Sequence, residues 1–251
     1  MLNKLKKSDF LKRNKLLNGW VLSECSATAE ILGSSKFNSI TIDLQHGMID
    51  FTKCKLILQI LSKYNIFPMV RVPSNEIGIT NKCLDAGAKG IICPLINNKK
   101  ECFNFTNNCY YPPKGIRSFG PTIASINDNN YFSNSNKEIL SIAMIETKES
   151  VQNLEEILTI DNLDMVYVGP YDLSISYGYT PNKVFEQKTM LNTYDLILNK
   201  ASKFGKKTAI HCAGGKTAKF FLNKGFTLVT IDTDLSLFKK GLDQELLLLN
   251  K

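Results

Sequence analysis

The feature that most constrains this chain is an alternation of short apolar runs with segments of helical spacing, repeated eight times. The apolar runs are rich in β-branched residues, as buried strands are. We predict strands at Gly19–Ser23, Ser39–Asp43, Pro68–Val72, Gly90–Leu95, Ser141–Glu146, Asp164–Gly169, Lys206–Cys212 and Thr227–Asp232. We predict the helices that follow them at Thr28–Lys36, Phe51–Tyr64, Ile77–Ala86, Lys99–Tyr110, Ser150–Leu158, Val184–Phe204, Lys216–Lys224 and Leu235–Leu249.

Strict alternation of strands and helices predicts a parallel sheet. Eight such units in 251 residues favour a closed (β/α)₈ TIM barrel, an α/β fold, over an open doubly wound sheet. We therefore expect a single domain over residues 1–251 and not two small ones. Residues 1–18 are expected to form a basic amphipathic helix, and residues 233–251 a C-terminal helix. One segment, Tyr111–Lys137, is longer than an ordinary loop and is predicted to be a functional loop or an interface arm.

Composition limits the possible partners. No apolar run approaches the length of a membrane span, and the N-terminus lacks the apolar region of a signal peptide, so we expect a cytoplasmic protein without a membrane partner. Seven cysteines without C-x-x-C spacing predict reduced, mostly buried thiols. The net charge of +8 invites a nucleic-acid hypothesis, but beyond the first sixteen residues the lysines are scattered. We expect no nucleic acid, and a charge that attracts small anionic substrates or is simply solvated.

The most informative stretch is Met165–Ser174, MVYVGPYDLS. Its apolar run ends at Gly169-Pro170 and leads into Asp172, where a parallel barrel keeps its chemistry. One unit earlier, the run SIAMIE ends at Glu146. Two carboxylates at the ends of successive strands predict a site for a hard divalent metal such as Mg²⁺ or Mn²⁺. The alternative is a Gly-Pro turn with two surface acids.

Further polar residues follow other predicted strands and fall on the same rim. The second strand supplies Asp43, Gln45 and His46, and the third contains Arg71. A histidine is more often structural than catalytic, but Asp43 could orient His46 and raise its basicity. Arg71 is unusual inside a strand unless it meets an anion, whose carboxylate its guanidinium can hold with two hydrogen bonds. For His211, also near a strand end, we predict a neutral, structural role.

These motifs occur together in the order and approximate spacing of a known family. The chain resembles the HpcH/HpaI aldolases, metal-dependent class II pyruvate aldolases of 2-keto-3-deoxy-sugar-acid type, from about Gly19 to Asp232. The motifs that carry the resemblance are IDLQHG, PMVRVP, CLDAGAKGIICP, YPPKGIRSFG, IETKESVQNLEEI and VGPYDLS.

The resemblance implies a metal held by Glu146 and Asp172, with Mg²⁺, Mn²⁺ or Co²⁺ as the cation. Pyruvate would chelate this metal, and its carboxylate would meet the backbone around Gly169, Pro170 and Tyr171. The resemblance also implies a homo-oligomer, a hexamer built as a trimer of dimers, in which the last helix is exchanged between subunits.

The remaining implied roles concern acid–base chemistry and the enolate. Arg71 would lie on the keto oxygen of pyruvate, Gln45 would contact substrate, and His46 with Asp43 would supply acid–base function. Cleavage of a 4-hydroxy-2-oxo acid to an aldehyde leaves a pyruvate enolate, which a metal and a guanidinium stabilise. The C4 hydroxyl must lose a proton, which suits a histidine. No Schiff-base lysine is needed.

Three positions depart from the pattern of many relatives. Gln45 replaces a Glu, Met144 replaces a Gln, and Tyr171 replaces a small residue. These departures leave the aldehyde partner open. They also keep two alternatives in view: another reaction of a pyruvate enolate, such as decarboxylation or acyl-lyase chemistry, and a barrel without catalysis that serves as a scaffold.

Overall fold

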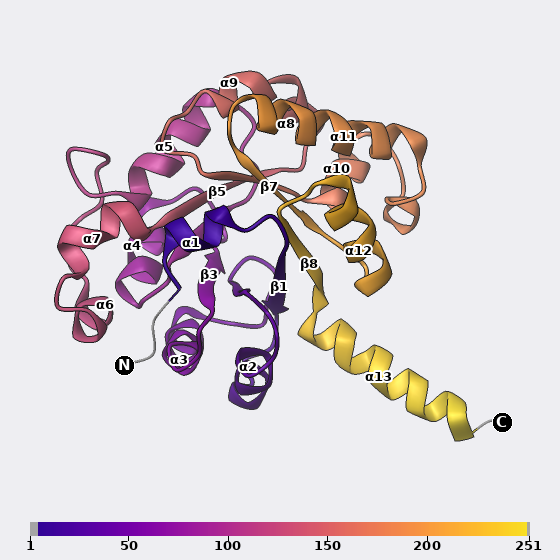
Figure 1. The fold of residues 1–251 in the computed structure, drawn as a ribbon, viewed down its shortest axis with the longest axis horizontal. Helices are drawn as coiled ribbons and strands as arrows, with labels where there is room; N and C mark the ends of the chain where they lie inside the picture. Colours follow the sequence, from indigo (N-terminus) through magenta and orange to yellow (C-terminus); the bar gives the residue numbers. More distant parts are fainter. Residues whose placement is uncertain (1–4, 250–251) are drawn as a thin grey trace.

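A computed structural model describes residues 5–249, apart from the side chain of Asn127. Eight parallel strands close into a barrel in the order β1-β2-β3-β4-β5-β6-β7-β8, with β1 paired to β8 (Figure 1). The (β/α)₈ fold predicted from the alternation is confirmed. The strands are β1 Leu16–Val21, β2 Ser39–Asp43, β3 Phe67–Arg71, β4 Gly90–Cys93, β5 Leu140–Ile145, β6 Met165–Val168, β7 Lys207–His211 and β8 Leu228–Thr233.

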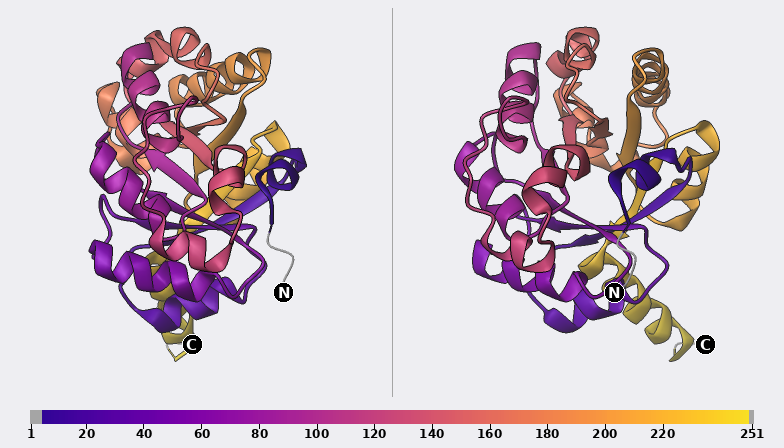
Figure 2. Two further views of the ribbon diagram at one scale, coloured as in Figure 1. Left: turned by 90° about the vertical axis from the view of Figure 1, so that its left-hand side faces the viewer. Right: turned by 60° about the vertical axis from the view of Figure 1, so that its left-hand side comes forward.

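Helices surround this barrel (Figures 1 and 2). Those at or near the predicted places are α2 Ser26–Gly33, α3 Phe51–Leu61, α4 Ile77–Asp85, α5 Lys99–Cys109, α11 Lys188–Lys203, α12 Gly215–Lys224 and α13 Asp234–Leu249. The predicted helix Ser150–Leu158 is two helices, α8 Lys148–Gln152 and α9 Leu154–Leu158. After β6 come α10 Pro170–Ser176 and the 3₁₀ turn η1 Pro181–Lys183. Among residues 5–249, no helix has the length and apolar character needed to cross a membrane.

Two apolar layers hold the barrel together. The larger lies between the strands and the helices, and the smaller fills the barrel interior. Because side chains alternate along a strand, the interior positions of β3 are Phe67 and Met69, and the next in phase is Arg71. The same phase along β5 passes Ile142 and Met144 and arrives at Glu146. Interior apolar residues thus lead to polar residues at the carboxyl ends of the strands.

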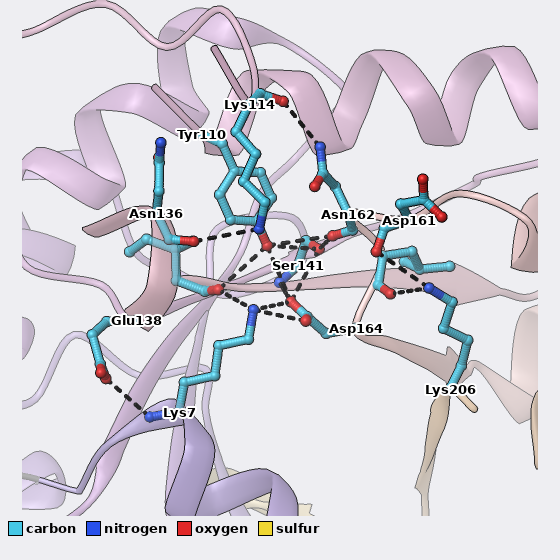
Figure 3. Close-up of polar contacts among 12 residues, drawn as sticks. Lys7, Tyr110, Lys114, Asn136, Glu138, Ser141, Asp161, Asn162, Asp164 and Lys206 are labelled. Carbon is cyan, nitrogen blue, oxygen red and sulfur yellow. Dashed lines mark hydrogen bonds and ion pairs between the residues drawn. The ribbon is translucent and has the colours of Figure 1, made fainter. Parts of the chain in front are cut away.

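The opposite end of the barrel is closed by α1, Lys7–Lys12, whose Phe10 is fully buried and stacks on Phe67 of β3. The predicted helix over residues 1–18 is therefore wrong in extent, since Leu16 opens β1 and residues 1–4 lie outside the described residues. The Nζ of Lys7 donates to the Asp164 carboxylate at 2.7 Å (Figure 3). A short amphipathic helix thus caps the barrel with an apolar face and one ion pair.

The long segment Tyr111–Lys137 contains two short helices, α6 Thr122–Asn127 and α7 Tyr131–Glu138. Its aromatic rings pack on one another, Tyr111 against Phe132 at 5.2 Å and Phe119 against Phe132 at 5.4 Å between ring centroids. The segment is an ordered arm beside α4, and its role as a functional or interface element stays a prediction.

The last helix, α13, starts at the barrel and runs away from it (Figures 1 and 2). Its first residue, Asp234, accepts hydrogen bonds from the backbone N–H groups of Leu22 and Ser23, at 2.9 and 3.1 Å, and is its one buried residue. Six of the seven cysteines are buried and Cys25 is exposed, which confirms the predicted burial of the thiols.

Candidate active site

Asp43 and Arg71 form a buried pair at the carboxyl ends of β2 and β3. The two residues are direct partners in the strand register. Arg71 Nε donates to Asp43 Oδ1 at 2.9 Å, and Nη2 donates to Oδ2 at 2.5 Å. Burial by itself would raise the pKa of Asp43, but the hydrogen bonds and charge of Arg71 hold it below its ordinary value. The Arg71 guanidinium thus holds a carboxylate with two hydrogen bonds, as expected of an arginine inside a strand, and this carboxylate belongs to the protein.

Trp20, at the end of β1, supports this pair from the barrel interior. Its indole Nε1 donates to Asp43 Oδ2 at 3.2 Å, and its ring lies 4.9 Å from the Arg71 guanidinium carbon. A cation over an indole face is stabilised by the ring quadrupole. Asp43 and Arg71 are thus fixed by a third side chain, and a fixed geometry is what an electrostatic catalyst needs.

The turn after β2 carries Gln45, His46 and Gly47. Asp43 Oδ1 accepts the backbone N–H groups of Gln45, at 2.9 Å, and His46, at 3.2 Å. A Cβ on Gly47 would collide with the carbonyl oxygen of Asp43, so the turn requires glycine. Asp43 therefore holds the main chain of His46 and not its ring, contrary to our prediction. The His46 side chain is exposed at the rim.

Glu146 follows β5 and is a buried acid, 2% exposed. Its Oε1 accepts the backbone N–H of Leu95 at 2.8 Å, while Oε2 has no hydrogen-bond partner in the described part of the chain. Leu95 has φ +53, a left-handed conformation that leucine rarely adopts. Burial raises the pKa of Glu146 to about 7, and the charge of Asp172 acts in the same direction, whereas the Leu95 N–H and the charge of Arg71 act against it. The opposing charge of Arg71 does not offset burial, so the pKa stays raised.

Gly169 and α10 bring the second carboxylate to the same place. A Cβ on Gly169 would collide with Glu146 Oε2, so the missing side chain makes room for the acid. Pro170 opens α10, and Asp172 lies exposed in its first turn. The rim thus holds two carboxylates, Glu146 buried and Asp172 exposed.

These carboxylates fit a divalent cation. Within residues 5–249, no group of three or more His, Cys, Asp or Glu side chains is arranged to hold a metal. Mg²⁺ and similar ions, however, are commonly held by one or two carboxylates, with substrate oxygens and water completing the shell. Glu146 and Asp172 are such a donor set.

The structure places two of the three residues that depart from the pattern of many relatives. Met144 lies on the floor, with Sδ 4.0 Å from Arg71 Nη1 and its methyl group beside Gly169. Tyr171 is 37% exposed and packs edge-on against Phe185 and His211, with centroid distances of 6.2 and 6.4 Å. Tyr171 therefore leans toward His211 at the end of β7.

Most predicted site residues come together at the carboxyl ends of β2, β3, β5 and β6. Sequence reasoning missed Trp20 and Leu95. Trp20 had a signal, as the one tryptophan of the chain and a member of the first predicted strand; the backbone contact from Leu95 had none. A cavity of about 340 Å³ lies elsewhere, between α3, α7 and the turn that follows α4, and no predicted site residue lines it.

Fold and site together define a class: a (β/α)₈ enzyme whose acids, arginine and histidine gather at the carboxyl end of the barrel, where enzymes of this fold keep their active sites. The family model for HpcH/HpaI aldolase/citrate lyase matches residues 17–240. The chain belongs to this family. It is an enzyme, a carbon–carbon lyase of aldolase type.

Individual relatives agree. A hydroxypyruvate/pyruvate aldolase of Rhizorhabdus wittichii is 33% identical over 229 residues, covering 91% of each chain. A 5-keto-4-deoxy-D-glucarate aldolase of Enterobacter sp. (strain 638) is 29% identical over 227 residues, covering 88% of this chain and 87% of that one. The crystal structure of a family member from Burkholderia cenocepacia superimposes with a TM-score of 0.91, covering 98% of both chains at 22% identity.

Proposed function

We propose that this enzyme forms or cleaves a 4-hydroxy-2-oxo acid, with pyruvate or a close analogue as the nucleophilic partner and an aldehyde as the other. The observation that carries the proposal is Glu146, a buried carboxylate with a raised pKa, one unpartnered oxygen and a second acid beside it. Such a group is costly to maintain unless a cation joins it. Relatives named as pyruvate aldolases support the choice of substrate.

Glu146 and Asp172 would hold the cation, which we propose to be Mg²⁺, Mn²⁺ or Co²⁺. When bound, it supplies positive charge beside the keto oxygen of the 2-oxo acid. The first-turn N–H groups of α10, at Tyr171 and Asp172, have no acceptor within the helix and would receive the substrate carboxylate beside Gly169 and Pro170.

Arg71 would face the same keto oxygen. Two of its donors are taken by Asp43, so the Nη1 edge, now against Met144, remains for the substrate. This edge would stabilise the enolate oxygen, while Asp43 and Trp20 keep the guanidinium in place. His46, exposed on the neighbouring turn, would take the proton of the C4 hydroxyl in cleavage and return it in synthesis. Gln45 would contact the substrate from the same turn.

Exchange of the pyruvate C3 hydrogens for deuterium in D₂O tests enolate formation without any aldehyde. We expect exchange that requires an added divalent metal and falls at least about 100-fold in Arg71→Lys, because lysine cannot reproduce the planar fork. Glu146→Gln should lose metal-dependent pyruvate binding in calorimetry. Undiminished exchange in Arg71→Lys, or wild-type binding in Glu146→Gln, would remove that residue from the mechanism.

We also propose that the enzyme is a homo-oligomer, a hexamer built as a trimer of dimers, with α13 exchanged between subunits. Leucine and phenylalanine side chains along α13 are exposed: Leu235, Phe238, Leu242, Leu246, Leu247, Leu248 and Leu249. An apolar surface of this length is typical of an interface. Light scattering at micromolar concentration decides: a monomeric mass contradicts the proposal. Buried, unpaired thiols support a reducing compartment, and we propose a cytoplasmic location.

A further inference from the structure

His211 ends β7 beside the proposed site and has one ring nitrogen that the protein leaves without a partner. Its Nδ1 lies 3.4 Å from the hydroxyl of Tyr167. Its Nε2, on the other side of the ring, has no hydrogen-bond partner among the residues that the structure describes. Nε2 is not among the buried side-chain atoms that lack a partner, so this nitrogen is open to water or to a bound ligand. The structural role that we predicted for His211 accounts for Nδ1 and leaves Nε2 available at the site.

The Nδ1 contact is the end of a polar chain inside the barrel. Tyr167 also bonds the hydroxyl of Thr230 at 2.6 Å, and Thr230 accepts from the Asn18 amide at 2.9 Å. Asn18 is held in turn by Ser39 and Thr41 of β2. All of these groups are buried. This series of hydrogen bonds fixes the Nδ1 edge of the imidazole toward the barrel interior. Nε2 therefore lies on the opposite edge.

The surroundings of His211 are aromatic and its ring stays neutral. The rings of Trp20 and Tyr171 pack edge-on against the imidazole, with distances between ring centroids of 5.2 and 6.4 Å. Burial lowers the pKa of His211 to about 4, and the charge of Arg71 acts in the same direction. The nearby Asp232 offers no alternative partner, since its oxygens accept from Lys240 and from the Thr233 N–H. The His211 ring is neutral and lies near Asp232, so it does not attract the carboxylate of a substrate.

A neutral imidazole presents Nε2 either as an N–H donor or as a lone-pair acceptor, depending on the direction of the Tyr167 hydrogen bond. A hydroxyl group suits both cases because it donates and accepts. An aldehyde carbon chain without a hydroxyl would leave Nε2 unpaired among aromatic rings, which costs binding.

We propose that His211 is a specificity residue that hydrogen-bonds a substrate hydroxyl group, either on a carbon of the carbon–carbon bond being formed or broken or on the carbon next to it, with Tyr167 as its positioning residue. The proposal rests on the proposed aldolase function. The hydroxyl has two possible sources: C3 of the donor, as in hydroxypyruvate, or C2 of the aldehyde, as in glycolaldehyde.

The test compares kcat/KM for matched substrate pairs with added Mn²⁺. One arm measures glycolaldehyde against acetaldehyde with pyruvate, and the other measures hydroxypyruvate against pyruvate with acetaldehyde. We expect the wild type to prefer the hydroxyl-bearing member in at least one arm. His211→Leu should lower that preference about tenfold. Because each preference is a ratio within one variant, a general loss of activity cancels. An equal loss for both members, or an unchanged ratio, overturns the proposal.

Two further variants keep the test decisive. Tyr167→Phe removes only the hydroxyl that holds Nδ1 and should lower the same ratio about threefold, with no additional loss in the double variant. Tyr194→Phe is the matched control, since its hydroxyl donates to the Val184 carbonyl at 2.9 Å in the outer layer, and its ratio should equal that of the wild type. Should His211→Leu not fold, an unchanged ratio in Tyr167→Phe overturns the proposal.

Failure of the proposed function is visible separately. Pyruvate C3–H exchange in the wild type reports the metal, Arg71 and enolate formation without any contribution from the aldehyde. Absence of metal-dependent exchange contradicts the aldolase proposal, whereas exchange with no effect of His211 on either ratio contradicts only the assignment of His211.

Discussion

Two acids at opposite ends of the barrel, Asp164 and Glu146, are satisfied to different degrees. At the amino end, Asp164 accepts from Lys7 Nζ at 2.7 Å, from the Ser141 N–H at 2.9 Å and from the Tyr110 hydroxyl at 3.1 Å (Figure 3). At the carboxyl end, Glu146 accepts one backbone N–H and has a second acid as its neighbour. Asp164 has its full set of partners within the protein, whereas one oxygen of Glu146 has none in the described residues. The difference separates groups that hold the fold from groups that wait for a substrate.

The largest expected effect comes from the same chemical change made at each end. Asp172→Asn should lower kcat/KM by about 1,000-fold, or about 4 kcal/mol, because a metal loses an anionic ligand. Its thermal stability should stay that of the wild type, since Asp172 is exposed. Steady-state kinetics and thermal unfolding of this variant and of Asp164→Asn test the contrast. A comparable loss of activity in both variants would contradict the functional difference between the two acids.

Asp164→Asn should act on stability alone. Neutralising this acid leaves the ammonium of Lys7, whose side chain is 11% exposed, without its ion-pair partner. We expect about 3–4 kcal/mol lower free energy of unfolding, the usual cost of breaking a buried pair. Urea unfolding measures it, and activity per folded enzyme should remain within about twofold. Lys7→Met in the same background should restore part of the stability.

The raised pKa of Glu146 predicts a pH dependence of the metal-free protein. The pKa of Glu146 is about 7 in the fold against an ordinary value of 4.5, so the unfolded chain releases this proton first. Stability is therefore lost as pH rises from about 4.5 to 7, by about 3 kcal/mol. With a chelator present, Glu146→Gln should be more stable than the wild type by this amount at pH 8 and equal to it at pH 4.5. A constant difference between the two pH values would contradict the assignment.

The smallest expected effect concerns backbone strain at the carboxyl end. Leu95 is the one non-glycine residue with positive φ between residues 5 and 249, and its N–H bonds Glu146. Leu95→Gly removes a strain of about 1–2 kcal/mol but frees the unfolded backbone, leaving a gain of about 0.5–1 kcal/mol. Thermal unfolding detects the gain. A loss of stability would mean that the exposed leucine side chain contributes more than the strain costs.

Much of the site could be predicted because strands carry a period of two. Once Phe67 and Met69 are assigned to the interior, Arg71 must point the same way, and the β2–β3 register then places Asp43 beside it. The alternation of strands and helices predicted the fold for the same reason, because the spacing of apolar residues indicates which face of each element is buried.

What could not be predicted depends on contacts between loops and on chain ends. The bond from Leu95 to Glu146 needs a left-handed backbone that leucine does not signal. The preference of Asp43 for the main chain of His46 depends on the tight turn at Gly47. The N-terminal helix was predicted too long because Leu16 and Leu17 fit a helical stripe as well as a strand, and their pairing with β8 decides between the two.

The pairing of β1 with β8 has a consequence for the order of folding. It joins Leu16–Trp20 to Leu228–Thr233, and Asp234 then bonds Leu22 and Ser23 across the same seam. During synthesis, β1 therefore emerges long before its second neighbour exists. Until then it is an unpaired edge that exposes apolar side chains to other nascent chains. Contacts so distant in sequence also form slowly, so closure of this seam is expected to be the late step that commits the barrel to its native state.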